Sequence, residues 1–147
     1  MGEVMRHTIL AALGVVLLLG SAQAEESYKP AVRVQKILET TTTTSGAPIR
    51  YPQTDQPLVQ SLIVEIPSGA ETGWHRHPVP AYAYILAGTI EVESEGQGKR
   101  IFRAGDSFAE MVDHRHNGRV VGEETVRILM IVTGQKGIAF SERTPAP

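Results

Sequence analysis

The chain has 147 residues, a formal charge of −2 and no cysteine, and its length is typical of a single domain. The lack of cysteine in the sequence excludes disulfides, thiolate zinc sites and cysteine nucleophiles. The near-neutral charge, without a basic block, gives no electrostatic footprint for nucleic acid, so no nucleic-acid partner is expected.

The first 24 residues have the three parts of a signal peptide. A short segment carrying Arg6 precedes an uninterrupted apolar or glycine run over 9–20, and Ala22-Gln23-Ala24 matches a small-residue cleavage site. The run is shorter than the roughly 20 residues that a membrane-spanning helix needs. We therefore expect cleavage after Ala24, export to the periplasm or out of the cell, and no membrane insertion of the mature protein.

Beyond the signal peptide, the pattern along the chain is that of β-strands. Residues 25–57 are expected to form an N-terminal arm, a first strand over 32–38 and a threonine-rich loop. Further strands are predicted over 58–66, 81–86, 89–93, 100–102, 107–112, 126–132 and 138–140, the strand over 126–132 being buried on both faces. Short strands at this spacing predict one all-β sandwich or barrel over 58–140, followed by a flexible tail over 141–147.

The candidate chemistry is concentrated in four histidines between positions 75 and 116. His75 and His77 lie two residues apart, which on a strand places both side chains on the same face. A third histidine from a neighbouring strand would give three converging imidazoles, ligands that suit Fe, Mn, Ni, Cu or Zn. A chance surface pair is the alternative that this spacing leaves open.

These histidines lie in two segments that resemble the two conserved motifs of the cupin superfamily. Gly69, five residues and then His75-Arg76-His77-Pro78 resemble the first motif, and Gly105-Asp106 with His116 eleven positions after the glycine resembles the second. The resemblance covers about residues 58–132. It implies a jelly-roll β-barrel that encloses one divalent transition metal, held by the three histidines of the motifs, His75, His77 and His116. It also implies a homodimer.

The sequence departs from the cupin pattern at the fourth ligand. The glutamate of the first motif would fall at Ala81. Glu110 is the candidate replacement, because cupins that read His-x-His-Pro-x-Pro often carry an acidic residue at that place. A site of three histidines alone, known among cupin dioxygenases, is the alternative. His114 shares strand parity with His116 but lies in a turn, and the offset from Gly105 favours His116 as the ligand.

A substrate pocket is expected beside the metal. Strand alternation continued from His75 and His77 would place Ala81, Ala83 and Ile85 on the inner face of the barrel, and the two small alanines would leave room there for a small molecule. A β-bulge between the two segments would invert the faces. Trp74 and Tyr82 are the candidate aromatic contacts at the mouth of this pocket. The pattern identifies no catalytic acid or base.

The sequence therefore predicts a single-domain, metal-binding cupin that acts on a small molecule. The first hypothesis is a metal-dependent oxidoreductase with dioxygenase-like chemistry. A metal acting only as a Lewis acid would instead support an isomerase or a decarboxylase. A non-catalytic metal or small-ligand binding protein of the cell envelope, and a barrel with an empty site, are the remaining alternatives.

Overall fold

The computed structural model describes Lys29 and residues 31–147. The unit Lys36–Pro147 contains all the strands described. In the other unit, Lys29 and residues 31–35 form no strand, and the Val32 N–H donates to the Lys29 carbonyl. The predicted signal peptide over 1–24 lies outside the described residues. None of the described residues belongs to a helix long and apolar enough to cross a membrane.

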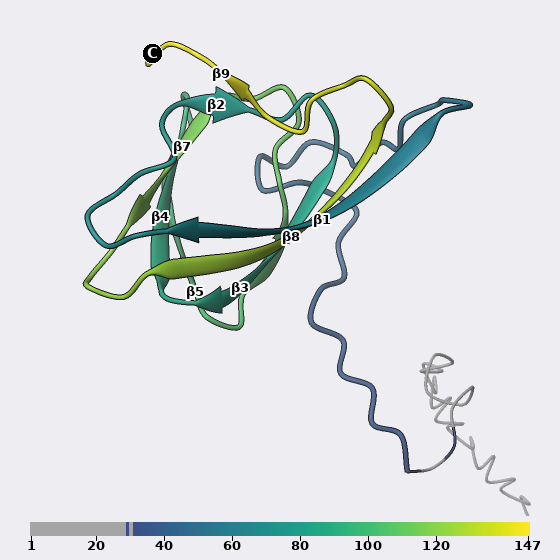
Figure 1. The fold of residues 1–147 in the computed structure, drawn as a ribbon, viewed down its shortest axis with the longest axis horizontal. Coiled ribbons are helices and arrows are strands. Elements are labelled where there is room, and N and C mark those ends of the chain that lie inside the picture. Colours follow the sequence, from purple (N-terminus) through teal and green to yellow (C-terminus); the bar gives the residue numbers. More distant parts are fainter. Residues whose placement is uncertain (1–28, 30) are drawn as a thin grey trace, which may run out of the picture. The chain divides into compact units, whose positions relative to one another are not determined.

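Two antiparallel sheets make up the unit Lys36–Pro147 (Figure 1). The strands are β1 (Pro57–Ile66), β2 (His75–Arg76), β3 (Ala81–Ala87), β4 (Thr89–Ser94), β5 (Gly98–Arg103), β6 (Ser107–Ala109), β7 (His116–Val120), β8 (Val126–Gln135) and β9 (Glu142–Arg143). One sheet has the order β1-β8-β3-β6 and the other has the order β5-β4-β7-β2-β9. This arrangement confirms the predicted all-β jelly-roll barrel.

The core lies between the sheets and follows the alternation of the strands. On β3, Ala81, Ala83 and Ile85 are buried while Tyr82 and Tyr84 are only half-buried, as the alternation predicts. Stacked rings of Phe102 and Phe108, with centroids 3.9 Å apart, extend the core towards β5 and β6. The inner faces of both sheets therefore supply one large apolar cluster, and Val79, Ala81, Met130 and Val132 form a second, smaller one.

The prediction that residues 126–132 are buried on both faces is wrong. On β8, Val126, Ile128, Met130 and Val132 are buried, whereas the residues between them are exposed or half-buried. β8 lies between β1 and β3, so it carries ladder hydrogen bonds on both edges, but only one of its faces meets the barrel interior. Residues 128–132 are apolar at every position, and Leu129 and Ile131 nevertheless face away from the barrel interior.

The strand predicted over 32–38 is also absent. Val34 and Ile37 are about half exposed, and this segment pairs with no strand among the described residues. Its alternation is local, whereas a strand exists only with a partner. The threonine-rich loop is confirmed: Thr42 bridges Pro48, and the Thr44 N–H donates to the Ala109 carbonyl.

Four further differences lie near the histidines. The strand predicted over 107–112 ends at Ala109, and residues 138–140 form no strand. β7 was not predicted, because Asn117 and Gly118 are poor strand formers. β9 falls in the segment predicted to be a flexible tail, and it pairs with β2 at one end of the barrel (Figure 1). Strands as short as β2 and β9 are formed by pairing rather than by local pattern.

Candidate metal centre

Three histidine side chains converge inside the barrel. His75 on β2 is paired directly with His116 on β7, and His77 follows β2 by one residue. One ring nitrogen from each histidine lies within 4.8 Å of those of the other two. The ring centroids are 4.3 Å apart for His75 and His116 and 5.0 Å apart for His75 and His77. The predicted convergence of three histidine side chains from the two motifs is therefore confirmed.

The orientation of each ring is fixed by a hydrogen bond to the backbone. In every case the Nδ1–H donates to a carbonyl oxygen, which leaves Nε2 as the unprotonated nitrogen. The acceptors are Gly73 for His75 at 2.8 Å, Phe140 for His77 at 2.8 Å and His114 for His116 at 2.9 Å. Metal-bound imidazoles need such a partner on their second nitrogen. The three rings are thus oriented for coordination through Nε2.

All three imidazoles are held neutral. Burial and the neighbouring imidazole of His116 lower the pKa of His75 to about 4. Burial also lowers the pKa of His77 and that of His116 from their ordinary values. A neutral ring has a free lone pair, which is the form that binds a metal ion.

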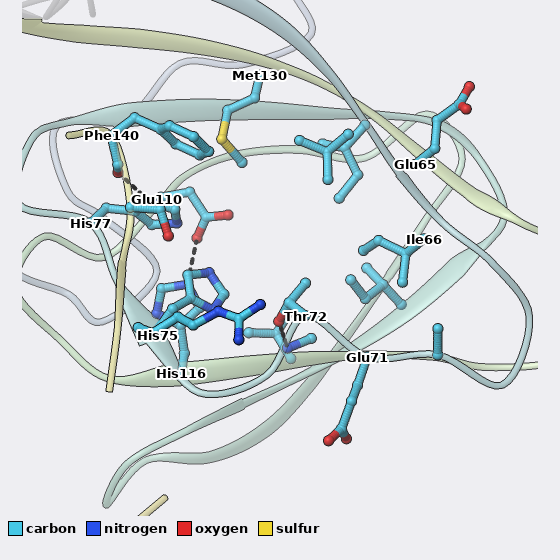
Figure 2. A pocket seen from close by; sticks show the side chains of 18 of the residues that line it. Glu65, Ile66, Glu71, Thr72, His75, His77, Glu110, His116, Met130 and Phe140 are labelled. Atoms are coloured by element: carbon cyan, nitrogen blue, oxygen red, sulfur yellow. Dashed lines mark hydrogen bonds and ion pairs between the residues drawn. The ribbon is translucent and has the colours of Figure 1, made fainter. Parts of the chain in front are cut away.

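Glu110 lies beside the histidines, where the first-motif glutamate is missing. Its Oε2 atom is 3.9 Å from Nε2 of His116, and its side chain is buried (Figure 2). Its backbone N–H donates to the Ala81 carbonyl at 2.8 Å, so it stands opposite Ala81 in the continuation of the β3–β6 ladder. Burial raises the pKa of the Glu110 carboxyl. The neighbouring strand thus supplies a carboxyl group next to the position where Ala81 offers none.

A cavity of about 350 Å³ opens beside the three histidines. Figure 2 shows the histidines and Glu110 on one side of it, Ile66 across from them and Thr72 between the two. Its apolar walls come from both sheets, and the side chains that form them include Val64, Ile66, Ile90, Val92, Phe108, Ile128 and Met130. Such a small, mostly apolar cavity with a few convergent polar groups is typical of a small-molecule site.

The structure places the four predicted pocket residues away from this lining. Ala81 and Ala83 are buried on the inner face of β3, but neither is among the residues that line the cavity. Trp74 borders a separate recess together with Arg143. Tyr82 projects from the other face of β3 and is half-buried.

His114 and Asp113 belong to the turn before β7. Nε2 of His114 is 3.0 Å from the Glu95 carbonyl, and its ring is not part of the histidine cluster. Asp113 has a φ of 53° and lies 3.3 Å from a guanidinium nitrogen of Arg76. The turn therefore contributes to the site through the His114 carbonyl, which accepts from His116.

Sequence reasoning missed four groups at the site. The carbonyls of Gly73, Phe140 and His114 orient the three histidines, and a backbone acceptor leaves no signal in the sequence. Arg143 lines the cavity from β9, beyond the region of family resemblance. Its register opposite His75 depends on a strand pairing that no local pattern predicts.

The comparisons with known proteins agree with this architecture. A family model described as a cupin domain matches residues 62–132. A comparison with curated protein sequences found no match. Among solved structures, the DMSP lyase DddQ from Ruegeria pomeroyi DSS-3 is 26% identical with a TM-score of 0.53, and the match covers 67% of this chain and 47% of that chain.

Two further solved structures share the fold at lower identity. The formate complex of oxalate decarboxylase from Lactobacillus farciminis is 22% identical with a TM-score of 0.50, covering 58% of this chain and 26% of that chain. A cupin-like protein from Thermotoga maritima MSB8 is 21% identical with a TM-score of 0.50, covering 58% of this chain and 64% of that chain. The chain spans less than two thirds of the length of each. The family match and the barrel geometry together identify residues 62–132 as a cupin domain.

Proposed function

We propose that this protein is a metal-dependent enzyme that converts a small molecule inside the barrel. The observation that carries the proposal is the state of two buried nitrogens. Nε2 of His77 and Nε2 of His116 have no hydrogen-bond partner among the described residues, and the same holds for Oε2 of Glu110. Buried polar atoms without partners cost free energy. A metal ion between them would satisfy all three.

The donor set fits one divalent transition metal. Nε2 of His75, His77 and His116 would hold the ion, and Glu110 would complete the set. Neutral imidazole and carboxylate suit Fe, Mn, Ni, Cu and Zn. Such an ion would supply Lewis acidity or, if redox-active, electron exchange with substrate and O₂. The cavity adjoins the histidines, so a substrate could reach the ion, as a catalytic site requires and a closed structural site does not.

The residues around the ion would bind the substrate and move a proton. Ile66, Ile90 and Ile128 would exclude water from the substrate. Glu110, whose pKa is raised by burial, would accept or return a proton close to the substrate when it is not bound to the ion. The backbone carbonyls that hold the three rings would keep the histidines in place through the reaction.

Two classes of reaction are supported by different observations. Similarity to a DMSP lyase supports redox-neutral cleavage with the ion as a Lewis acid. The ring nitrogens of three histidines lie together without Glu110. A site of three histidines alone resembles that of cupin dioxygenases and so supports the dioxygenase-like alternative. Consumption of O₂ distinguishes them. An oxygen-electrode assay of the Fe-loaded or Mn-loaded protein with a panel of small organic acids gives a signal only for the oxidative class.

Metal binding is tested by elemental analysis after loading with Fe, Mn, Ni, Cu and Zn separately. We expect about one equivalent in the wild type, loss in His77→Ala and in His116→Ala, and retention in the matched control His114→Ala. Loss of metal in His114→Ala with retention in His116→Ala would show that the second motif is misaligned. No metal in any of the proteins would favour an empty barrel, and metal without any turnover would favour a carrier.

Export and homodimer formation stay predictions. The N-terminal pattern over 1–24 supports cleavage after Ala24. Mass spectrometry of the protein from the periplasmic fraction and from the medium would then find a mature chain that begins at Glu25. Sedimentation analysis of that chain tests the homodimer. An intact N-terminus on protein recovered from the cytosol alone would contradict export.

A further inference from the structure

β9 brings one arginine to the same face of the sheet as the histidines. In the β2–β9 pair, His75 stands opposite Arg143 and Arg76 stands opposite Glu142. Residues directly opposite each other in an antiparallel pair project to the same face, and successive residues alternate between faces. Because His75 projects into the cavity, Arg143 must project there as well, and both residues are among those that line it.

The opposite face of the same pair shows how β9 is held. Two guanidinium nitrogens of Arg76 donate to Oε2 of Glu142, at 3.0 and 2.7 Å. The Thr144 N–H donates to the Trp74 carbonyl at 2.9 Å. These contacts hold the segment without using the side chain of Arg143. The arginine is thus placed at the cavity by its neighbours and is free to bind something else.

Arg143 is also a cation of the cavity lining that has no ion-pair partner among the described residues. Glu65 is paired with Arg127 and Glu71 with Arg119, each at 2.9 Å. Glu110 is buried beside the histidines, away from any arginine partner in the described part of the chain. Arg143 is exposed, and its side chain makes no hydrogen bond or ion pair with any described residue. Its guanidinium therefore offers all of its donors at the mouth of an apolar cavity.

We propose that Arg143 binds the carboxylate of a small organic acid whose apolar part lies along Ile66, Ile90 and Ile128. The planar guanidinium matches a carboxylate with two parallel hydrogen bonds. A phosphate would bring more oxygens than one arginine and an apolar wall can satisfy. This inference rests on the proposed function, since it names the substrate class of the same site, and it makes Arg143 the residue that selects acids over neutral molecules.

The test measures binding rather than turnover. Pentanoate, its neutral analogue pentanamide and inorganic phosphate are titrated by calorimetry into the full chain, both metal-free and Zn-loaded. We expect wild-type protein to prefer pentanoate over both other probes. Arg143→Gln should weaken pentanoate binding by about ten- to hundredfold, the range for a lost hydrogen bond to a charged group. Arg143→Lys should recover part of it.

The matched control is Arg103→Gln, which removes the same charge from an exposed position outside the cavity lining. It should bind pentanoate as the wild type does. The assignment is overturned if pentanoate does not bind the wild type, if pentanamide or phosphate binds equally well, or if Arg143→Gln binds like Arg103→Gln. Zinc content separates the two proposals: wild-type protein that retains no zinc contradicts the metal-dependent function, while the metal-free titration still tests Arg143.

Discussion

The backbone N–H of Glu110 donates to the carbonyl of Ala81, which sets the two residues opposite each other across neighbouring strands. Position 81 is where the first cupin motif would carry its glutamate, and Glu110 brings a buried carboxyl to within 3.9 Å of the His116 ring from the other strand. The β3 strand carries no carboxylate at this position, and the segment beside it supplies a buried one. The presence of a carboxyl group beside the histidines therefore depends on the strand pair rather than on the first motif alone.

Moving the carboxylate back across the ladder should restore the site. We expect Glu110→Ala to lower Zn affinity by about tenfold or more. The double variant Ala81→Glu/Glu110→Ala should recover most of that loss, because the two positions share a face. Tyr82→Glu/Glu110→Ala, with the carboxylate on the other face of β3, should recover none. Isothermal titration with Zn²⁺ measures all four proteins, and equal affinities in the two double variants would contradict the shared face.

Direct coordination by Glu110 predicts proton release. Burial raises the pKa of this carboxyl, so the metal-free protein keeps a proton there up to a higher pH than an exposed glutamate would. A metal ion that binds the carboxylate must displace that proton. Calorimetry of Zn²⁺ binding in two buffers of different ionisation enthalpy should show about one proton fewer released by Glu110→Gln than by the wild type. Equal release from both proteins would favour the site of three histidines alone.

The stability of the metal-free protein should depend on pH below neutrality. The pKa of His75 is about 4 in the folded protein and about 6.5 in the unfolded chain, so between these values the unfolded chain binds one more proton. The free energy of unfolding should therefore fall as the pH decreases from 6.5 towards 4, by about 3 kcal/mol from His75 alone. His77 and His116 act in the same direction. Glu110 acts in the opposite one, since its folded pKa is raised and its contribution is lost as the pH rises.

Urea denaturation across this pH range measures the effect. The slope of the unfolding free energy against pH reports how many more protons the unfolded chain binds than the folded protein. His75→Gln should lower that number by about one between pH 4 and 6.5. A variant with the same pH dependence as the wild type would show that His75 is not held neutral by burial.

The close approach of the β3–β4 connection to the start of β8 makes Gly88 sensitive to substitution. Gly88 has a φ of +79°, and a Cβ there would lie 3.0 Å from both Cα and Cγ2 of Val126. We expect Gly88→Ala to cost about 2–4 kcal/mol in unfolding free energy, from backbone strain and overpacking together. Gly105→Ala is the control, with a φ of +95° but nothing within 4 Å of the added Cβ. Chemical denaturation should find the smaller loss at Gly105, and equal losses would contradict the packing argument.

The parts of this protein that sequence predicted best are those fixed by short-range pattern. The alternation of β3 and the two-residue spacing of His75 and His77 both follow from the geometry of a single strand. Glu110 was a candidate because the family pattern left a gap at Ala81. Its Oε2 atom lies 3.9 Å from Nε2 of His116, and coordination of a metal by Glu110 stays a prediction.

The parts that could not be predicted depend on pairing between distant segments. Residues 32–38 alternate like a strand but have no partner among the described residues, whereas Glu142 and Arg143 carry no strand signal and pair with β2. β7 contains Asn117 and Gly118, and it is a strand because β4 and β2 flank it. Arg143 became a candidate only through this register. Composition and local period contain no information on which distant partner a short segment will find.

The hydrogen bond from the His77 ring to the Phe140 carbonyl joins residues 63 positions apart. Undocking of the short segment around Phe140 would free Nδ1 of His77, and the ring could then turn or exchange its tautomer. Short peripheral segments open more often than the barrel unfolds. We therefore expect the off-rate of the metal ion to follow the local opening of this segment. The time for which a bound metal ion resists a chelator would then depend on how tightly the segment around Phe140 is docked. It would not depend on the free energy of unfolding of the whole barrel.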